Sequence, residues 1–317
     1  MKDNTLAPII IPTLCRYDHF KRCIESLAAN KLASETELYI GLDYPPSERY
    51  EDGWKKIKEY IPTIQGFKRV VTLEASKNLT AQGNIEALKN HIRQLGYESY
   101  IFTEDDNVFS PNFLEYANWG LREFENDNTI FAIVGFKRVN VEFLRNNVYK
   151  YPRYVAWGIA TWFDRVDKID KFKDFERLSH IVRSYSPTII FSDKLNIARS
   201  IIRMIKNQYI LEDTLPSLLS SEELFCIYPK VSMVRNMGFD GSGLHGGNND
   251  TISKLYQLIP LDDKESFMPH IEEPLYNKNL KKAYKFAYKK SFRFSAWLVG
   301  AFSFLVFRYT GLFWRVS

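Results

Sequence analysis

Several features that would assign the protein to a specialised class are scarce in its sequence. Only three of the 317 residues are cysteines (Cys15, Cys23 and Cys226), and none has the Cys-x-x-Cys or Cys/His spacing of a zinc site. Three cysteines cannot form a disulfide framework, so we interpret them as reduced thiols of a cytosolic protein. The apolar stretch before Pro12 is too short for the core of a signal peptide, which also favours the cytosolic side.

Acidic residues are missing from the C-terminal part of the chain. No Asp or Glu follows Glu273, whereas residues 274–317 contain nine Lys or Arg. The remaining residues comprise 34 basic and 38 acidic side chains, a net charge of −4 that the overall value of +5 conceals. A basic tail therefore follows a mildly acidic body, and a partner attracted by positive charge would bind the tail.

The composition is that of a folded protein. With 45% hydrophobic and 26% charged residues, the chain can bury the core of one large domain or two small ones, and it is neither disordered nor a coiled coil. Short β-branched runs predict strands at residues 7–12, 37–42, 69–73, 100–103 and 129–135. Apolar residues at helical spacing predict helices around 20–27, 54–60, 84–95 and 113–124.

This alternation predicts an α/β domain with a mostly parallel, Rossmann-like sheet. The functional site of such a domain lies at the carboxyl ends of the strands. Residues 163–209 are charged and helical without clean alternation, and we interpret them as a helical insertion or a cap over the site.

Three consecutive acids, Glu104, Asp105 and Asp106, follow the fourth predicted strand. Like charges at this spacing must be solvated, paired or neutralised by a cation. If the extended geometry continues, Glu104 and Asp106 point to the same side, which suits Mg²⁺ or Mn²⁺ held with help from a diphosphate. The alternative is a solvated turn that caps the next helix.

Polar residues also end the first two strands. Thr13 and Arg16 follow the first, and Asp43 follows the second. Such groups at neighbouring strand ends can hold a base and ribose, with Arg16 reaching phosphate. Taken singly, Arg16 is more often a surface ion-pair residue and Asp43 a turn residue.

The order of these motifs (PTxxR, Asp, then EDD) resembles the nucleotide-sugar-binding half of GT-A-fold glycosyltransferases. It is similar in particular to bacterial family 2-type sugar transferases related in pattern to the Golgi N-acetylglucosaminyltransferase that opens complex N-glycans. The resemblance implies that Glu104 faces the ribose, that Asp105 belongs to the nucleotide-binding set and that Asp106 binds the metal. It also implies that Asp43 lies near the uracil, with Thr13 and Arg16 near the nucleotide.

Two later stretches extend the resemblance. RYVAWGIATW, from Arg153, is similar to the R-x-x-x-W-G-x-A-T-W segment at the floor of the sugar and acceptor site, which would place Trp157 and Gly158 against the donor. A core hairpin is the alternative interpretation. The stretch from Tyr228 to His245 resembles the signature YPKxSxVxNxGxDGSGxH, whose glycines suit a phosphate-binding loop and whose His245 would contact the metal or the diphosphate.

An inverting transfer needs a general base that takes the proton of the acceptor hydroxyl. Glu212 and Asp213 precede Cys226 by the same interval as the acidic pair of the Golgi enzyme, whose second member is the base. The resemblance therefore implies that Asp213 is the base, and Glu222 and Glu223 are kept as alternatives.

The tail combines basic, aromatic and uncharged segments. Lysines alternate with aromatic residues between 279 and 293, and an uncharged run follows from 294 to 307. Fourteen residues rise about 21 Å as a helix, short of the roughly 30 Å hydrocarbon core, so we expect an interfacial helix on anionic lipid rather than a spanning one. The alternatives are a helix packed on the body and a nucleic-acid-binding arm, and the uncharged run argues against the latter.

These inferences combine into one functional expectation. Residues 1–260 would form a GT-A glycosyltransferase domain, with a nucleotide-binding half (1–125) and an acceptor and catalytic half (126–260), and residues 261–317 a membrane-associating tail. The enzyme would use Mn²⁺ or Mg²⁺ to transfer a sugar, with inversion, from a UDP-linked donor to a lipid-linked glycan of bacterial surface polysaccharide, on the cytoplasmic face of the cell membrane. The alternatives are a non-catalytic nucleotide-sugar-binding protein and a metal-dependent phosphohydrolase.

Overall fold

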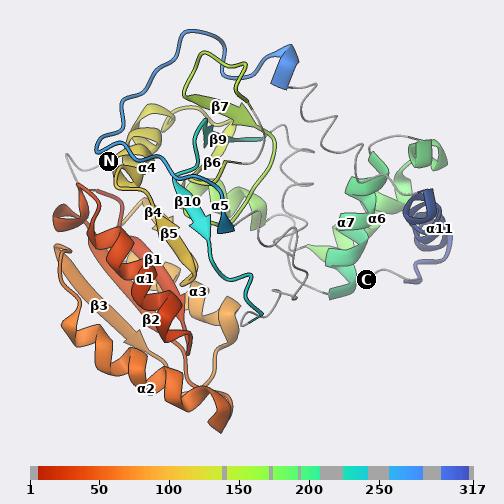
Figure 1. Cartoon of the computed structure of the whole chain (residues 1–317). Helices are drawn as coiled ribbons and strands as arrows, with labels where there is room; N and C mark the ends of the chain where they lie inside the picture. The colour runs from red at the N-terminus through yellow and green to blue at the C-terminus, as the bar shows by residue number, and fades with distance from the viewer. Residues whose placement is uncertain are drawn as a thin grey trace.

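The computed structural model describes residues 6–137, 141–170, 174–191, 194–207, 224–241, 257–280 and 294–313. Strands and helices alternate through its first half, as the sequence predicts (Figure 1). The strands are β1 (Ile9–Thr13), β2 (Glu37–Leu42), β3 (Arg69–Glu74), β4 (Ser99–Phe102), β5 (Asn107–Phe109) and β6 (Ile130–Val134). The α-helices between them are α1 (Tyr17–Ala28), α2 (Glu51–Tyr60), α3 (Thr80–Gln94) and α4 (Phe113–Glu123). Short 3₁₀ turns occur at η1 (Ala33–Glu35), η2 (Glu48–Tyr50) and η3 (Ile61–Thr63).

The apolar patterns explain these elements. Ile9, Ile10 and Ile11 are fully buried because helices cover both faces of β1, the environment that favours a continuous β-branched run. In α1 the buried side chains are those at helical spacing, Phe20, Cys23, Ile24 and Leu27. The two faces of the sheet thus carry the two apolar clusters that form the core.

The main sheet has eight strands in the order β3-β2-β1-β4-β8-β6-β9-β7. It is completed by β7 (Val148–Tyr151), β8 (Ile159–Trp162) and β9 (Phe225–Pro229). The first four strands are mutually parallel, β8 runs antiparallel to both of its neighbours, β9 is parallel to β6, and β7 is antiparallel to β9. The predicted α/β class with a mostly parallel sheet is confirmed.

A second sheet has two strands, β5 and β10 (Val234–Asn236), paired antiparallel. β5 begins directly after the acidic triplet, and β10 belongs to the glycine-containing stretch that follows β9. The small sheet therefore joins two segments more than a hundred residues apart in the chain, next to the acidic residues.

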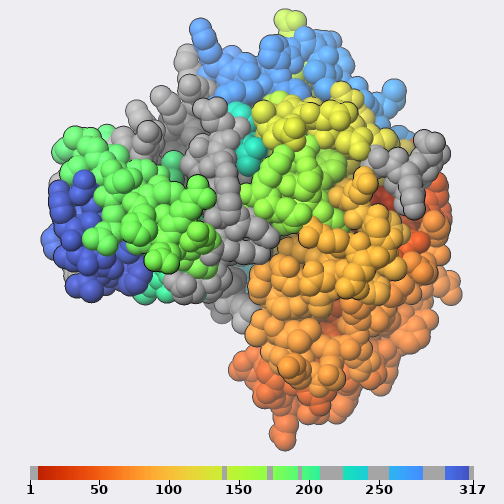
Figure 2. Space-filling view, turned by 180° about the vertical axis from the view of Figure 1, so that it is seen from behind, coloured from red at the N-terminus to blue at the C-terminus, as the bar shows by residue number. Residues whose placement is uncertain are grey.

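Several helices follow β8; the first packs against β8 itself, and the later ones pack against one another. They are α5 (Phe163–Asp170), α6 (Phe175–Ser184), the 3₁₀ turn η5 (Pro187–Phe191) and α7 (Lys194–Asn207), which confirms the helical character expected of this segment. The C-terminal helix α11 (Phe294–Thr310) packs against α6 and α7 at the outer edge of the molecule in both views (Figures 1 and 2). We call α6, η5, α7 and α11, with residues 311–313, the helical unit.

Helix α11 has one buried and one exposed side. Ala301, Phe304 and Phe307 are buried against the other helices, as the packed-helix alternative expects, whereas Leu298 and Phe302 are about half exposed. Within the part of the chain that the structure describes, no helix is long and apolar enough to cross a membrane.

Candidate nucleotide-binding site

The candidate site lies where the parallel strands β1 and β4 end. Thr13 closes β1, and residues 103–106 leave β4 directly beside it, because Ile10 pairs with Phe102. The backbone N–H of Asp43, at the end of β2, donates to the carbonyl of Thr13 at 3.0 Å. The three strand ends that the sequence singled out therefore meet at one edge of the sheet.

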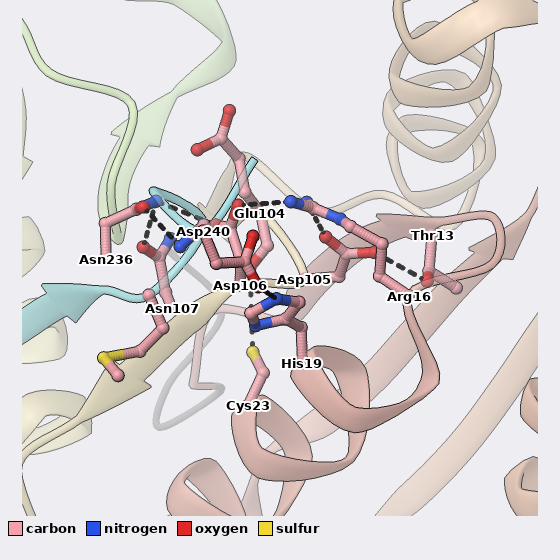
Figure 3. A network of polar contacts seen from close by, with 12 residues as sticks. Thr13, Arg16, His19, Cys23, Glu104, Asp105, Asp106, Asn107, Asn236 and Asp240 are labelled. Atoms are coloured by element: carbon pink, nitrogen blue, oxygen red, sulfur yellow. Dashed lines mark hydrogen bonds and ion pairs between the residues drawn. The ribbon is translucent and has the colours of Figure 1, made fainter. Parts of the chain in front are cut away.

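Asp105 and Asp106 share one cation, Arg16. The guanidinium donates through one NH₂ group to Oδ1 of Asp105 and through the other, at 2.8 Å, to Oδ2 of Asp106 (Figure 3). Thr13 adds a hydrogen bond from its hydroxyl to Oδ2 of Asp105 at 2.9 Å. Both aspartate side chains are less than 10% exposed, so the single positive charge of Arg16 partly offsets two negative charges that are largely removed from water.

The pKa values follow from this pairing. Burial raises the pKa of Asp105, although Arg16 and Thr13 act in the opposite direction. Burial alone would lower the pKa of Arg16, but the two aspartates outweigh it and hold that pKa above its ordinary value. Arg16 is thus a permanent counter-charge for the pair.

The extended backbone that one interpretation continues through Glu104, Asp105 and Asp106 ends with β4 at Phe102. Residues 105 and 106 form a turn, so Asp105 and Asp106 are the two acids that share a cation. Figure 3 shows the Glu104 carboxylate pointing away from these two aspartates. The triplet is therefore a turn, as its alternative interpretation holds, but its two aspartates are buried and paired rather than solvated. The capping role of that alternative, given to Asp106 or Asn107, is wrong, because the N-cap of α4 is Asn112.

The second side of the site comes from β10. The Asn236 side-chain N–H donates to Oδ1 of Asp106 at 2.8 Å and to Asn107 at 3.1 Å. The side-chain oxygen Oδ1 of Asn236 accepts from the backbone N–H of Gly238 at 2.9 Å, and the Met237 N–H donates to the backbone carbonyl of Asp106 at 2.8 Å. A Cβ on Gly238 would lie 2.0 Å from Oδ2 of Asp106, so only glycine allows this approach.

The same loop is also held to α1. Oδ2 of Asp240 lies 2.8 Å from Nε2 of His19, and the other ring nitrogen of His19 lies 3.0 Å from the Arg22 guanidinium. Residues 236–241 therefore bridge from β10 to α1 across the acidic turn (Figure 3). The sequence did not indicate His19 as a site residue, and it offered Asn107 only as a candidate helix cap, because their partners Asp240 and Asn236 are distant in the chain.

Asp43 has a structural task at this edge. Its carboxylate accepts from the backbone N–H groups of Tyr44 and Leu79, both at 2.8 Å, and from the Asn78 side chain at 3.2 Å. These bonds join the loop after β2 to the start of α3, where Thr80 has the left-handed φ of 65°. The contact of Asp43 with a uracil stays a prediction.

Trp157 and Gly158 precede β8. Trp157 packs edge-on against Phe136 and against Phe239 of the loop that follows β10. Gly158 has a φ of 62°, and a Cβ there would lie 2.6 Å from Val234. The left-handed backbone conformation and the close packing against Val234 explain why a glycine occupies position 158. Its approach to a sugar donor stays a prediction.

Four predicted residues lie outside the described part of the chain: Asp213, Glu222, Glu223 and His245. Among the described residues, no group of three or more His, Cys, Asp or Glu side chains could hold a metal ion. Asp106 nevertheless suits a hard cation that takes most of its ligands from a diphosphate, because each of its oxygens accepts one hydrogen bond from the described residues and has a second lone pair.

Comparison with known proteins gives structural matches alone. Neither a protein-family model nor a curated protein sequence matches the chain. A mannosyltransferase from Pyrobaculum calidifontis, solved with GDP-Man and Mn²⁺, matches at 14% identity with a TM-score of 0.36, over 51% of this chain and 46% of its own.

Two structures of S. aureus TarS also match, both at 13% identity. The longer gives a TM-score of 0.35 over 71% of this chain and 37% of TarS, and a structure of residues 1–349 gives 0.37 over 69% and 70%. The chain thus spans less than half the length of the mannosyltransferase and of the longer TarS structure. Similarity this low does not indicate a shared activity, which has to be argued from the site.

Proposed function

We propose that the protein is a glycosyltransferase that uses a nucleotide-sugar donor. The observation that carries the proposal is the meeting of three distant motifs at one sheet edge: Thr13 and Arg16 after β1, the acidic turn after β4, and the loop after β10. A diphosphate needs cationic and backbone N–H donors, and a bound cation needs a carboxylate. Arg16, Asp106 and the glycine-containing loop supply these groups within one network.

In this proposal each residue has a distinct task. Asp106, with His245, would hold Mn²⁺ or Mg²⁺, which offsets the charge of the leaving diphosphate when bound. Arg16 holds the two aspartates in place through its ion pairs, and it would contact the phosphates of the donor. Asp213 is proposed to take the proton of the acceptor hydroxyl as the sugar is transferred with inversion.

The substrates and location are proposed from the sequence. The donor would be UDP-linked, with Glu104 on the ribose, Asp43 near the base, and Trp157 and Gly158 shaping the sugar pocket. The acceptor would be a lipid-linked glycan of bacterial surface polysaccharide, reached at the inner face of the cell membrane. Residues 1–260 would hold the site and residues 261–317 the membrane-associating part.

The test measures donor binding and product formation separately. Release of nucleoside diphosphate from a panel of UDP- and GDP-sugars should require Mn²⁺ or Mg²⁺. Asp106→Ala should abolish the cation-dependent part of nucleotide binding, measured by calorimetry. Asp167→Ala is a matched control, because this half-exposed aspartate forms a surface ion pair with Arg93.

The other outcomes are distinguishable. Full activity in excess EDTA, or in Asp106→Ala, would contradict the metal role. Release of inorganic phosphate in place of nucleoside diphosphate would indicate a phosphohydrolase. Cation-dependent nucleotide binding without any product would indicate a non-catalytic binding protein.

A further inference from the structure

Apolar surface is concentrated on the helical unit. The unit contains about a fifth of the described residues but half of the large hydrophobic side chains that are exposed among them. Single exposed hydrophobic residues are common on soluble proteins, whereas a contiguous group marks an interaction surface.

The exposed side of α11 forms one stripe. Leu298, Phe302 and Tyr309 are 48%, 51% and 63% exposed, and their spacing of four and seven residues places them on one face of the helix. Leu312 and Phe313, just beyond the helix end, are also exposed, and the Phe313 ring lies 5.4 Å from that of the buried Phe307. We call Leu298, Phe302 and Tyr309 the outer face of α11.

The neighbouring turn enlarges the same surface. Phe191 of η5 is 79% exposed and lies beside Trp297, with ring centroids 6.2 Å apart. The Trp297 N–H donates to the Ile190 carbonyl at 2.7 Å, which fixes η5 against α11. Helix α11, which carries the outer face, is therefore packed against η5.

Arginines border this surface. Nε of Arg308 donates to the Tyr185 carbonyl at 2.7 Å, and its guanidinium lies 4.8 Å from the ring centre of Tyr309. The exposed Arg183 donates to the Arg308 carbonyl at the C-terminal end of α11.

The charge of the unit has one sign near the outer face. Its described residues include seven Lys or Arg and one acid, Glu176. Glu176 lies in the first turn of α6, whose N-cap is Asp174, whereas α7 and α11 contain no acid. An apolar stripe with a basic border matches an anionic lipid surface, where aromatic rings enter the headgroup region and arginines face the phosphates.

We propose that the outer face of α11, together with Phe191 and its arginine border, docks on an anionic phospholipid surface. A second copy of the chain is the main alternative occupant. A two-fold contact through this face would bring two arginine borders of like charge together, which disfavours it. The inference names the contact surface of the membrane-associating part proposed above and rests on that part of the proposal, whereas vesicle binding can be measured without any transfer activity.

The test measures binding of the full-length protein to vesicles. Phosphatidylcholine vesicles and vesicles that also contain phosphatidylglycerol are compared by flotation. We expect binding to the anionic vesicles that weakens as salt is added and a much smaller binding to the neutral ones. Absence of binding to anionic vesicles would overturn the proposal.

Matched variants locate the contact. Leu298→Gln/Phe302→Gln should lower the partition coefficient by about tenfold or more, because two apolar side chains no longer enter the interface. Leu95→Gln/Phe143→Gln is the control, since these residues are 52% and 50% exposed on the body of the protein. Equal losses in the two variants would overturn the assignment to α11.

The arginine border is tested separately. Arg183→Gln should lower binding to anionic vesicles by about fivefold, Arg183→Lys should retain it, and the exposed Arg122→Gln on α4 should have no effect. If the wild-type protein is a dimer in solution, if Leu298→Gln/Phe302→Gln is a monomer, and if both bind vesicles equally, the lipid proposal is overturned. The occupant of the outer face would then be a second copy of the chain. The wild-type salt dependence and the Arg183 variants give a result even if the double variant unfolds.

Discussion

At the scale of residues, the site depends on how two adjacent carboxylates are neutralised. Asp105 and Asp106 share Arg16, and Asn236 holds the second oxygen of Asp106. A divalent cation at Asp106 would lie next to Arg16, so the arginine and the cation act on the same negative charge. Removal of Arg16 should therefore make the protein more dependent on the cation.

We expect Arg16→Met to destabilise the fold by about 3 kcal/mol at neutral pH, because it leaves two buried carboxylates without their counter-charge. The pKa of Asp105, already raised by burial, should rise further. An ionised acid with a raised folded-state pKa destabilises the fold above that pKa, so the defect should shrink as the pH falls. Urea unfolding at neutral and acidic pH measures this.

The same variant reports on the cation. Mn²⁺ should raise the melting temperature of Arg16→Met more than that of the wild type, since Asp106 gains a replacement counter-charge. Arg93→Met, which removes a half-exposed surface ion pair, is the control and should respond to neither pH nor Mn²⁺. A destabilisation independent of both would show that Arg16 contributes by packing alone.

Gly238 gives a second prediction at this scale. Gly238→Ala should lower nucleotide affinity by about tenfold or more, because the new Cβ would overlap Asp106 and displace its carboxylate. Gly83→Ala, in the first turn of α3, meets only Leu79 at 3.2 Å and should slightly stabilise the helix. Calorimetry with UDP and Mn²⁺ compares the two variants, and unchanged affinity in Gly238→Ala would remove Asp106 from the binding site.

At the scale of elements, α11 has a buried side that packs against other helices and an exposed side, and the two should differ in their contribution to stability. Phe304→Ala should destabilise the helical unit by about 3 to 5 kcal/mol, because this fully buried ring fills space between helices. Phe302→Ala, on the exposed side, should change the stability by less than about 0.5 kcal/mol. Thermal unfolding followed by tryptophan fluorescence, to which Trp297 contributes, measures both, and similar losses would contradict the packing of α11.

Local elements could be predicted from the sequence, whereas their long-range partners could not. The predicted strand at 37–42 coincides with β2, and the predicted helix at 113–124 differs from α4 by one residue, because short β-branched runs and helical periodicity are local signals. The sequence also indicated the strand-end residues Thr13, Arg16 and Asp106. The pairing of β5 with β10, which brings Asn236 to Asp106, has no local signal and appears only in the fold.

At the scale of the whole molecule, the C-terminal helix completes a packed layer. A chain ending at residue 293 should aggregate or lose cooperative unfolding, because removal of Phe304 and Phe307 exposes the apolar sides of α6 and α7. Size-exclusion chromatography measures this, with full-length Leu298→Gln/Phe302→Gln as a control that should remain monodisperse. A soluble, cooperatively unfolding truncation would show that the layer does not need α11.

The place of β9 in the sheet has a consequence for the order in which the protein folds. β9 lies between β6 and β7, although both are synthesised well before it. During translation, strands β1 to β4 can pair with one another as soon as they emerge from the ribosome. By contrast, one edge of β6 stays unpaired, and β7 has no partner strand, until residue 229 at the end of β9 has left the ribosome. The intervening helices have this interval to form. Closure of the sheet at β9 is thus a late, long-range step, and only after it can β10 pair with β5 and bring Asn236 to Asp106.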